Sequence, residues 1–270
     1  LAAIERARAE GLDITQDQYG YAASSTSIGT LIPKKYREAG KFGEDYTNAQ
    51  THAQMLNDMR SRRERNGADD YSYAFIASYR HNKSLNGLNV AQAAKKLRGS
   101  DALDDQIETI LEIQKNGGAS AVFHSINEQD LQKFMQHPNT MFASDSGVRR
   151  FNEGVPHPRG YGNNPRVLAR YVRELKVLRL EDAIRKMSSL PANTFHFTGR
   201  GELREGNWAD IVLFDPEKVQ DEAKYNDPHH YPRGIPFVLV NGMVVLDNGK
   251  HTGAKAGQAL RHSVKPAELQ

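Results

Sequence analysis

The 270-residue sequence contains no cysteine, which excludes disulfide bonds, cysteine nucleophiles and cysteine-ligated zinc within this chain. It has no apolar run near the ~20 residues that a membrane-spanning helix needs, so we expect no membrane partner. Neither charge dominates, because 36 basic and 33 acidic residues leave a net charge of +3. The basic cluster 60–65 is typical of a solvated helix face, and we therefore expect no nucleic acid partner. What remains is a globular protein long enough to bury a large core.

The chain begins inside a helical pattern. Leu1, Ile4 and Ala7 follow one another at helical spacing, and neither an initiator methionine nor a capping residue precedes them. We therefore expect the later part of something longer, with any targeting signal outside this sequence. Gly11 is suited to end the helix, and the alternating stretch 12–21 predicts a strand. A helix, a glycine and a strand make half of a repeating βα pattern.

The stretch His137–Gly147 carries the clearest functional signal. Its apolar run 140–143 predicts a short buried strand that brings Asp145 to its C-terminal end, before a loop of small residues. Catalytic groups collect at that end of the strands in α/β barrels. An aspartate before Ser-Gly is equally typical of a turn cap, and spacing alone does not separate the two interpretations.

Further candidate binding residues lie around this stretch. Tyr19 lies near the end of the predicted strand 12–21, where a half-buried aromatic with an exposed hydroxyl is the simpler interpretation, and Ser25 follows in a hydroxyl-rich loop. The segment 149–164 predicts a long loop that contains Arg159. Long loops at the catalytic face of a barrel commonly carry binding groups.

Between the predicted strand 12–21 and the stretch His137–Gly147, residues 28–118 predict a mostly helical insertion. His124 ends a strand that follows the insertion and could reach a pocket, although a lone histidine is more often structural. We predict a helix capped by Thr47 or Asn48 that ends near residue 66, one capped by Asn89 that ends near 97, and one capped by Ser100 or Asp101 that ends near 114. Strands are predicted at 73–78 and 119–125. A further helix at 128–136 begins after Asn127.

The last third of the chain changes from helices to strands. We expect helices at 165–174, with proline in the first turn, and at 180–189, and then strands from Gly199 onward. The dipeptide Asn241-Gly242 predicts a hairpin turn. The adjacent His229 and His230 could suggest a metal. Adjacent side chains diverge in extended backbone and no third ligand is apparent, so we interpret the pair as loop surface.

Several of these motifs together resemble one family. They are Asp17-Gln-Tyr-Gly-Tyr21 with Ser24-Ser-Thr26, His137-Pro…Ala-Ser-Asp145, Pro156-His-Pro-Arg159, the helix 165–173, and Gly201-x-Leu-x-x-Gly…Ala-Asp-Ile-Val-Leu-Phe-Asp-Pro216 with Val240-Asn-Gly242. The last group is shared widely by amidohydrolases. Over nearly its whole length the chain resembles the C-terminal portion of the N-acyl-D-amino-acid deacylases (D-aminoacylases) of the amidohydrolase superfamily.

The resemblance implies a fold and residue roles. The implied α/β fold is the C-terminal part of a metal-dependent (β/α)8 barrel with an inserted helical lobe, plus a segment of a small β-sandwich. Asp145 looks like the general base and acid for a metal-bound water, a residue that in many relatives also contacts the metal. Arg159 and Tyr19 match the residues that hold the substrate's α-carboxylate, and Ser25 matches a small hydroxyl near the acyl site.

The resemblance also implies a division of the chain and its partners. We expect barrel residues at 1–198, including the insertion 28–118, then sandwich strands at 199–255 and a polar tail at 256–270. The cofactor is expected to be a divalent metal, zinc above all, held mainly by residues that this chain lacks. The implied partners are a small N-acyl amino acid and the N-terminal portion of the same protein, as a second chain or a missing segment.

The sequence departs from the family at two places. Relatives usually have Gly-Ser-Asp-Gly where this chain has Ala-Ser-Asp145-Ser-Gly, and Gly20 replaces a usual proline, which we expect to loosen the segment that holds Tyr19. Three functions stay open. They are deacylation of an N-acyl amino acid of the D or L series, hydrolysis of a cyclic amide of the dihydroorotase or hydantoinase kind, and a non-catalytic remnant or partner subunit without the metal site.

Overall fold

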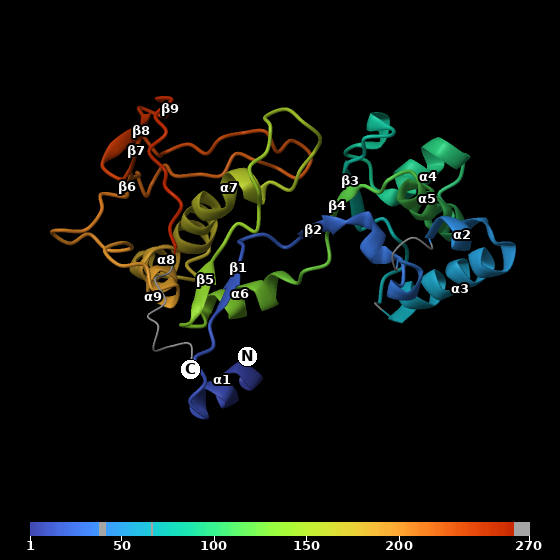
Figure 1. The fold of residues 1–270 in the computed structure, drawn as a ribbon, viewed down its shortest axis with the longest axis horizontal. Helices are drawn as coiled ribbons and strands as arrows, with labels where there is room; N and C mark the ends of the chain where they lie inside the picture. Colours follow the sequence, from blue (N-terminus) through green and yellow to red (C-terminus); the bar gives the residue numbers. More distant parts are fainter. Residues whose placement is uncertain (38–41, 66, 262–270) are drawn as a thin grey trace.

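The computed structural model describes residues 1–37, 42–65 and 67–261, and these residues have a mixed α/β fold (Figure 1). They form three separate sheets, with strand orders β1-β5, β2-β4-β3 and β6-β7-β8-β9, and no closed barrel. In Figure 1 the sheet β2-β4-β3 and helices α2 to α5 form a lobe at one side, which we call the inserted lobe. None of the helices in the described residues is long and apolar enough to cross a membrane.

A parallel pair of strands lies at the centre of the chain's functional region. β1 (Gln16–Gln18) and β5 (Thr140–Phe142) pair in register from Gln16 opposite Thr140 to Gln18 opposite Phe142. Parallel strands end at the same edge, so the residues that follow both strands meet there. β1 is shorter than the predicted strand 12–21, because only three of its residues find a partner backbone in β5.

Helices pack around this pair and bury its apolar residues. Phe142 shares one hydrophobic cluster with Met135, Val167 and Tyr171, which come from α6 and the helical segment after α7. The helices of this body are α1 (Ala2–Ala9), α6 (Glu128–Gln136), α7 (Arg159–Arg166), the π-helix Val167–Glu174, α8 (Leu180–Met187) and α9 (Ser189–Thr194).

The structure corrects the predicted helix start at Pro165. The helix begins six residues earlier at Arg159, because Pro158 takes a helical conformation and its carbonyl accepts the first backbone hydrogen bonds. Pro165 therefore lies inside the helix, where it cannot donate a backbone hydrogen bond. The chain then continues as a π-helix, and the predicted loop 149–164 ends at Pro158. Arg159 is thus held in a helix rather than in a loop.

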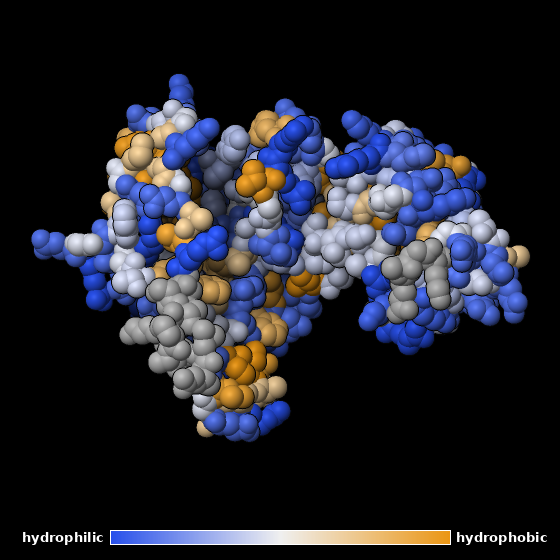
Figure 2. Space-filling model, viewed as in Figure 1, coloured by the Kyte–Doolittle hydropathy of each residue, from blue (hydrophilic) through white to orange (hydrophobic). Residues whose placement is uncertain are grey.

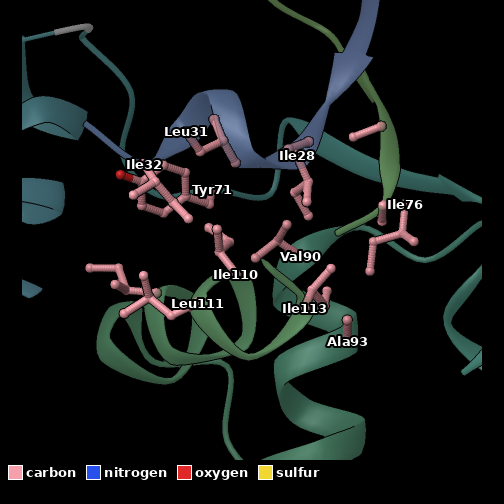
Figure 3. Packing of buried hydrophobic residues seen from close by; sticks show 14 of the residues in the cluster. Ile28, Leu31, Ile32, Tyr71, Ile76, Val90, Ala93, Ile110, Leu111 and Ile113 are labelled. Carbon is pink, nitrogen blue, oxygen red and sulfur yellow. The ribbon is translucent and has the colours of Figure 1, made fainter. Parts of the chain in front are cut away.

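The inserted lobe combines an antiparallel sheet with helices and has its own core (Figure 3). Asn89 caps α4 as predicted and forms a capping box with Gln92, and Gly99 ends the helix at φ 81°. The predicted cap of α5 is wrong, because the N-cap residue is Ala102 and Ser100 instead accepts the N–H of Ala102. The strands are β2 (Ser24–Ser27), β3 (Ala74–Ser78) and β4 (Ser120–Phe123), and the α-helices are α2 (Phe42–Thr47), α3 (Ala49–Arg65), α4 (Val90–Arg98) and α5 (Leu103–Lys115).

Local signals at other helix starts agree with the structure. Asn48 accepts two backbone N–H groups at the start of α3, and Asn127 does the same for α6. The predicted end of the first of these helices, Asn66, lies outside the described residues. Both caps depend only on residues a few positions away, which is why the sequence predicts them.

The two faces of the inserted sheet differ. Ile76 and Ala121 point into the core of the lobe, while Phe75, Val122 and Ser25 occupy one rung on the opposite face. The chain that follows β5 lies against the edge strand β3 of this sheet, since the N–H of Val155 donates to the carbonyl of Ala77 at 2.7 Å. The inserted lobe is therefore hydrogen-bonded to the loop between β5 and α7.

The C-terminal strands form an antiparallel sheet of four, made of β6 (Ile211–Leu213), β7 (Phe237–Val240), β8 (Met243–Asp247) and β9 (Lys250–His251). Asn241 and Gly242 form the predicted hairpin turn, and both have positive φ, 50° and 80°, as a type I′ turn requires. Apolar residues gather on the surface over this sheet and around α1 (Figure 2). Leu12, Val212 and Met243 are each more than half exposed.

Candidate functional site

Four residues singled out from the sequence meet beside the carboxyl ends of β1 and β5. Tyr19 directly follows β1, and Asp145 lies three residues after β5. Arg159 begins α7, and Ser25 lies on β2 of the inserted lobe. The site therefore contains residues from the inserted lobe and from the part of the fold that holds β1 and β5.

Arg159 is the centre of this group. Its side chain is 6% exposed, and its Nη2 lies 2.9 Å from Oδ2 of Asp145 and donates to the carbonyl of Ser25 at 3.4 Å. Its Cζ lies 4.4 Å from the ring centroid of Tyr19, within the range of a cation–π contact. The Nη1 atom is buried and has no hydrogen-bond partner among the described residues. The guanidinium therefore has an N–H group that is buried and lacks an acceptor among the described residues.

Asp145 is held in an uncommon backbone conformation. Its φ is 47°, in the left-handed region that aspartate tolerates better than most residues. Its carboxylate is 70% exposed and bound to Arg159, and no backbone N–H of the described chain donates to it. A turn cap would accept such an N–H, so the structure does not support the turn-cap interpretation.

His157 is the main residue whose role the sequence did not predict. Its Nδ1 accepts the backbone N–H of Arg159 at 3.0 Å, and its Nε2 is 2.9 Å from the carbonyl of Ala23, to which it donates. These two bonds require the neutral imidazole with the proton on Nε2. The side chain is 2% exposed, and burial lowers its pKa to about 3. His157 therefore joins the start of α7 to the strand segment that leads into the inserted lobe.

An aromatic layer surrounds His157. Its ring makes edge contacts with Tyr19, Tyr21 and Tyr225, at centroid distances of 5.8, 5.2 and 5.3 Å. Burial raises the pKa of Tyr19, and the positive charge of Arg159 partly opposes that rise. The Tyr19 hydroxyl therefore stays protonated and able to donate at neutral pH. The Tyr225 contact had no sequence signal, since that residue lies in a polar, turn-rich stretch.

A largely buried ion pair between Arg166 and Asp221 contacts this aromatic layer through Tyr21. Arg166 Nη1 lies 3.1 Å from Oδ2 of Asp221, and the hydroxyl of Tyr21 donates to the same oxygen at 3.4 Å. Burial raises the pKa of Asp221, although Arg166 opposes the rise. The pair also binds the main chain of the site, because Arg166 Nε donates to the carbonyl of Gly20 at 2.6 Å.

The expectation that Gly20 loosens the segment of Tyr19 is wrong. Gly20 is buried, and its N–H donates to Oδ1 of Asn163 at 3.0 Å. A Cβ on Gly20 would lie 3.2 Å from Cγ2 of Val167 and 3.4 Å from Cε2 of Tyr171. Because it has no Cβ, Gly20 allows the segment after β1 to pack closely against the π-helix, and it does not make the backbone there more flexible.

The other histidines considered in the sequence analysis fall outside this group. His124 lines a separate cavity of about 490 Å³ and contacts the rings of Phe75 and Tyr225. His137 lies at the opposite end of β5, where its Nε2 forms a hydrogen bond with Oε1 of Glu5. The loop-surface interpretation is right for His230, which is exposed.

That interpretation is wrong for His229. Its Nδ1 accepts the hydroxyl of Tyr161 at 2.8 Å and the N–H of Asn152 at 3.1 Å, and its Nε2 donates to the carbonyl of Gly154 at 3.0 Å. His229 therefore fixes the loop that follows Asp145. The sequence could not predict this role, because the three partners lie about 70 residues or more away along the chain.

The described residues do not fit a metal ion. No group of three or more His, Cys, Asp or Glu side chains in this part of the chain could hold one. Asp145, which we expected to contact the metal together with ligands from outside this chain, forms an ion pair with Arg159 instead. A metal site that uses Asp145 would need further ligands from residues other than those described.

Comparison with known proteins shows the family to which this chain is related. Residues 44–246 match the model of the amidohydrolase family. The N-acyl-D-glutamate deacylase of Alcaligenes xylosoxydans xylosoxydans is 34% identical over 246 residues, which cover 91% of this chain and 41% of that protein. A crystal structure of D-aminoacylase is similar with a TM-score of 0.73 and 30% identity, over 97% of this chain and 45% of that one.

A second solved structure is equally similar. It is the N-acyl-D-glutamate deacylase of Bordetella bronchiseptica with zinc and a phosphonate inhibitor, with a TM-score of 0.72, 30% identity and coverage of 97% of this chain and 45% of that one. The chain thus spans less than half the length of these relatives. From the family match and these relatives, the chain belongs to the amidohydrolase family and is related to its N-acyl-D-amino-acid deacylases.

Proposed function

We propose that this chain is the substrate-binding and proton-transferring portion of a metal-dependent hydrolase that removes the acyl group from an N-acyl amino acid, of the D or L series. The observation that carries the proposal is the buried, unpaired Nη1 of Arg159. A buried donor without an acceptor costs ~1–3 kcal/mol. A carboxylate matches the planar guanidinium better than any other common acceptor, and the substrate's free α-carboxylate would supply it.

Tyr19 and Ser25 complete the proposed pocket. The Tyr19 ring lies against the guanidinium of Arg159, and its protonated hydroxyl would donate one directional hydrogen bond to the same carboxylate. Ser25 holds Arg159 through its backbone carbonyl, which leaves its hydroxyl for the acyl group. Because Arg159 itself is fixed through His157, we expect the pocket to be formed before substrate arrives.

Asp145 is the proposed general base and acid. Its exposed carboxylate is close enough to Arg159 to face the amide of a substrate whose α-carboxylate is bound there. It would take a proton from the attacking water and deliver that proton to the leaving amine nitrogen. An exposed carboxylate that is bound on one oxygen keeps its other oxygen free for this transfer.

The rest of the proposed enzyme would come from outside these residues. We propose that β1 and β5 are two neighbouring strands of a (β/α)8 barrel, with residues 1–198 as its C-terminal part and 199–255 as sandwich strands. The outer edges of both strands are unpaired in the described chain, and exposed parallel edges are unstable in isolation. The N-terminal portion of the same protein, as a second chain or a missing segment, would supply the other strands and the ligands of a zinc ion.

The test is hydrolysis by the protein assembled with that portion and loaded with zinc. Release of free amine from N-acetyl amino acids of both series should be measured for the wild type, Asp145→Asn and Arg159→Ala, with a cyclic amide assayed in parallel. Asp145→Asn should lower kcat by ~100-fold or more, because it removes the proton acceptor. Arg159→Ala should mainly raise KM, since it removes binding of the carboxylate.

Asp13→Asn is a matched control, because the Asp13 side chain is 91% exposed and lies outside the site. A wild-type kcat in Asp145→Asn would remove Asp145 from the reaction. Faster hydrolysis of the cyclic amide would favour a dihydroorotase or hydantoinase kind of enzyme. An assembled protein that binds no zinc and hydrolyses none of these substrates would support the non-catalytic alternative.

A further inference from the structure

Asp221 lies in the long connection between β6 and β7, far along the chain from the residues of the candidate site. Figure 1 shows this connection as an orange loop that runs from the C-terminal sheet towards α7. The side chain of Asp221 is only 5% exposed. Its Oδ2 accepts from Nη1 of Arg166 at 3.1 Å and from the hydroxyl of Tyr21 at 3.4 Å, and its Oδ1 accepts from Nε2 of Gln220 at 3.1 Å. Both carboxylate oxygens are thus engaged by internal donors, so Asp221 does not present a free oxygen to a substrate.

Arg166 connects this carboxylate to the main chain beside Tyr19. The Nε of Arg166 donates to the carbonyl of Gly20 at 2.6 Å, and Gly20 directly follows Tyr19 in the sequence. The N–H of the same glycine donates to Oδ1 of Asn163, another residue of α7, at 3.0 Å. Both backbone polar groups of Gly20 are therefore bound by α7, and Asp221 fixes the arginine that binds one of them.

The arginines at the two ends of α7 make similar contacts with the segment after β1. Arg159 and Arg166 are seven residues apart, which places them on one face of the helix, two turns from each other. Cζ of Arg159 lies 4.4 Å from the ring centroid of Tyr19, and Cζ of Arg166 lies 4.7 Å from that of Tyr21. Arg166 has an internal carboxylate partner in Asp221, whereas the buried Nη1 of Arg159 lacks an acceptor among the described residues. The helix thus contacts this segment twice, once at an internal ion pair and once at the position proposed for the substrate's carboxylate.

We infer that Asp221 is a positioning residue for the proposed deacylation and acts on Tyr19 through Arg166. This inference rests on the proposed function, because it concerns how Tyr19 is held to bind the substrate's α-carboxylate. A phenol hydroxyl donates one directional hydrogen bond, so its contribution to binding depends on the backbone that carries its ring. Without the charge at position 221, Arg166 loses its counter-charge and the carbonyl of Gly20 loses a fixed donor. The Tyr19 hydroxyl would then meet the carboxylate in fewer molecules, and substrate binding would weaken.

The experiment is a double-mutant cycle in the assembled, zinc-loaded enzyme. KM and kcat are measured for the wild type, Asp221→Asn, Tyr19→Phe and the variant with both substitutions. The substrate is the N-acetyl amino acid that the wild type hydrolyses best among those tested for the proposed function. Asp215→Asn is the matched control, because it makes the same change in the same connection, where the carboxylate pairs with the exposed Lys218. Arg166→Lys is a second test variant, since it keeps a positive charge beside Asp221 but removes the Nε donor to the main chain.

We expect Asp221→Asn and Arg166→Lys each to raise KM by about tenfold and to change kcat by less than about twofold, because they weaken binding of the carboxylate and leave the proton transfer intact. Tyr19→Phe should raise KM by a similar factor, since it removes the hydroxyl itself. Adding Asp221→Asn to Tyr19→Phe should raise KM by less than about twofold more, because the group on which Asp221 acts is already absent. A purely structural role would instead lower the fraction of active enzyme, and so the apparent kcat, with KM unchanged.

A wild-type KM in Asp221→Asn overturns the inference alone, and so does a rise in KM that is the same with and without the Tyr19 hydroxyl. An equal rise in Asp215→Asn also overturns it, because that carboxylate lies outside the contact with Arg166. If circular dichroism shows that Asp221→Asn does not fold, Arg166→Lys is combined with Tyr19→Phe in the same cycle and is judged by the same outcomes. Failure of the wild type to hydrolyse any N-acetyl amino acid overturns the proposed function, and the inference with it.

Discussion

The buried neutral His157 should make the protein sensitive to acid well above the pH at which its carboxylates titrate. The imidazole is 2% exposed, and both ring nitrogens are engaged by backbone groups in the neutral state. Protonation would place a second donor against the N–H of Arg159. Burial and the nearby positive charges of Arg159 and Arg149 hold the pKa at about 3. The folded protein therefore excludes a proton that the unfolded chain accepts.

The direction and size of the effect follow from this difference. As pH falls below ~6.5, the unfolded chain gains a proton at His157 and the folded chain does not, so the free energy of unfolding decreases. Between pH 7 and pH 5 the loss is about 2 kcal/mol, at ~1.4 kcal/mol for each pH unit below 6.5. The loss continues until the pH reaches the folded pKa near 3.

Substitution of the histidine separates this effect from other acid-sensitive groups. His157→Gln should be less stable at pH 7, because it loses ring contacts with three tyrosines, but its stability should fall by about 2 kcal/mol less between pH 7 and pH 5. Urea unfolding followed by circular dichroism at both pH values measures the difference. The control His81→Gln changes an exposed histidine and should behave as the wild type. Equal losses in the wild type and His157→Gln would refute the reasoning.

Two further substitutions test the packing around the site. Gly20→Pro should lower the free energy of unfolding by ~1–3 kcal/mol, because it removes the N–H donated to Asn163. We expect this loss although relatives usually have proline at this position. An unchanged midpoint of urea unfolding would contradict the prediction. Lys186 is 1% exposed and donates to the carbonyls of His137 and Thr140, and burial lowers its pKa to about 8. The free energy of unfolding should therefore rise by up to ~1.4 kcal/mol per pH unit between pH 8 and 10, and Lys186→Met should lose that rise. A similar rise in the variant would contradict the assignment to Lys186.

Signals that depend on close neighbours in the chain predicted the fold best. Asn89 and Gln92 form a capping box across three residues, and the Asn241-Gly242 turn needs only its own two positive φ angles. The start of α7 depends instead on burial of the Arg159 segment against distant residues. A proline in that helix misled the prediction, because tertiary packing outweighed its local preference.

The candidate site divides in the same way. The family resemblance assigned Tyr19 and Arg159 to the same site as Asp145, and the parallel pairing of β1 with β5 explains why Tyr19 and Asp145 meet at one edge. His157 and Tyr225 could not be placed, since their ring contacts join segments about 70 to 140 residues apart. Nothing within a few positions of either residue records such a contact. Their roles follow only from the three-dimensional arrangement.

The self-contained core of the inserted lobe has a consequence for how the site assembles. Tyr19 and Asp145 are separated by about 126 residues, a span that is costly to close as a flexible loop. Once β2 pairs with β4 and the lobe is folded, only about 27 residues of connecting chain remain free, which reduces the entropy of loop closure by ~1.4 kcal/mol. The folded lobe thus shortens the flexible connection between the two strands, and its folding favours the pairing of β1 with β5.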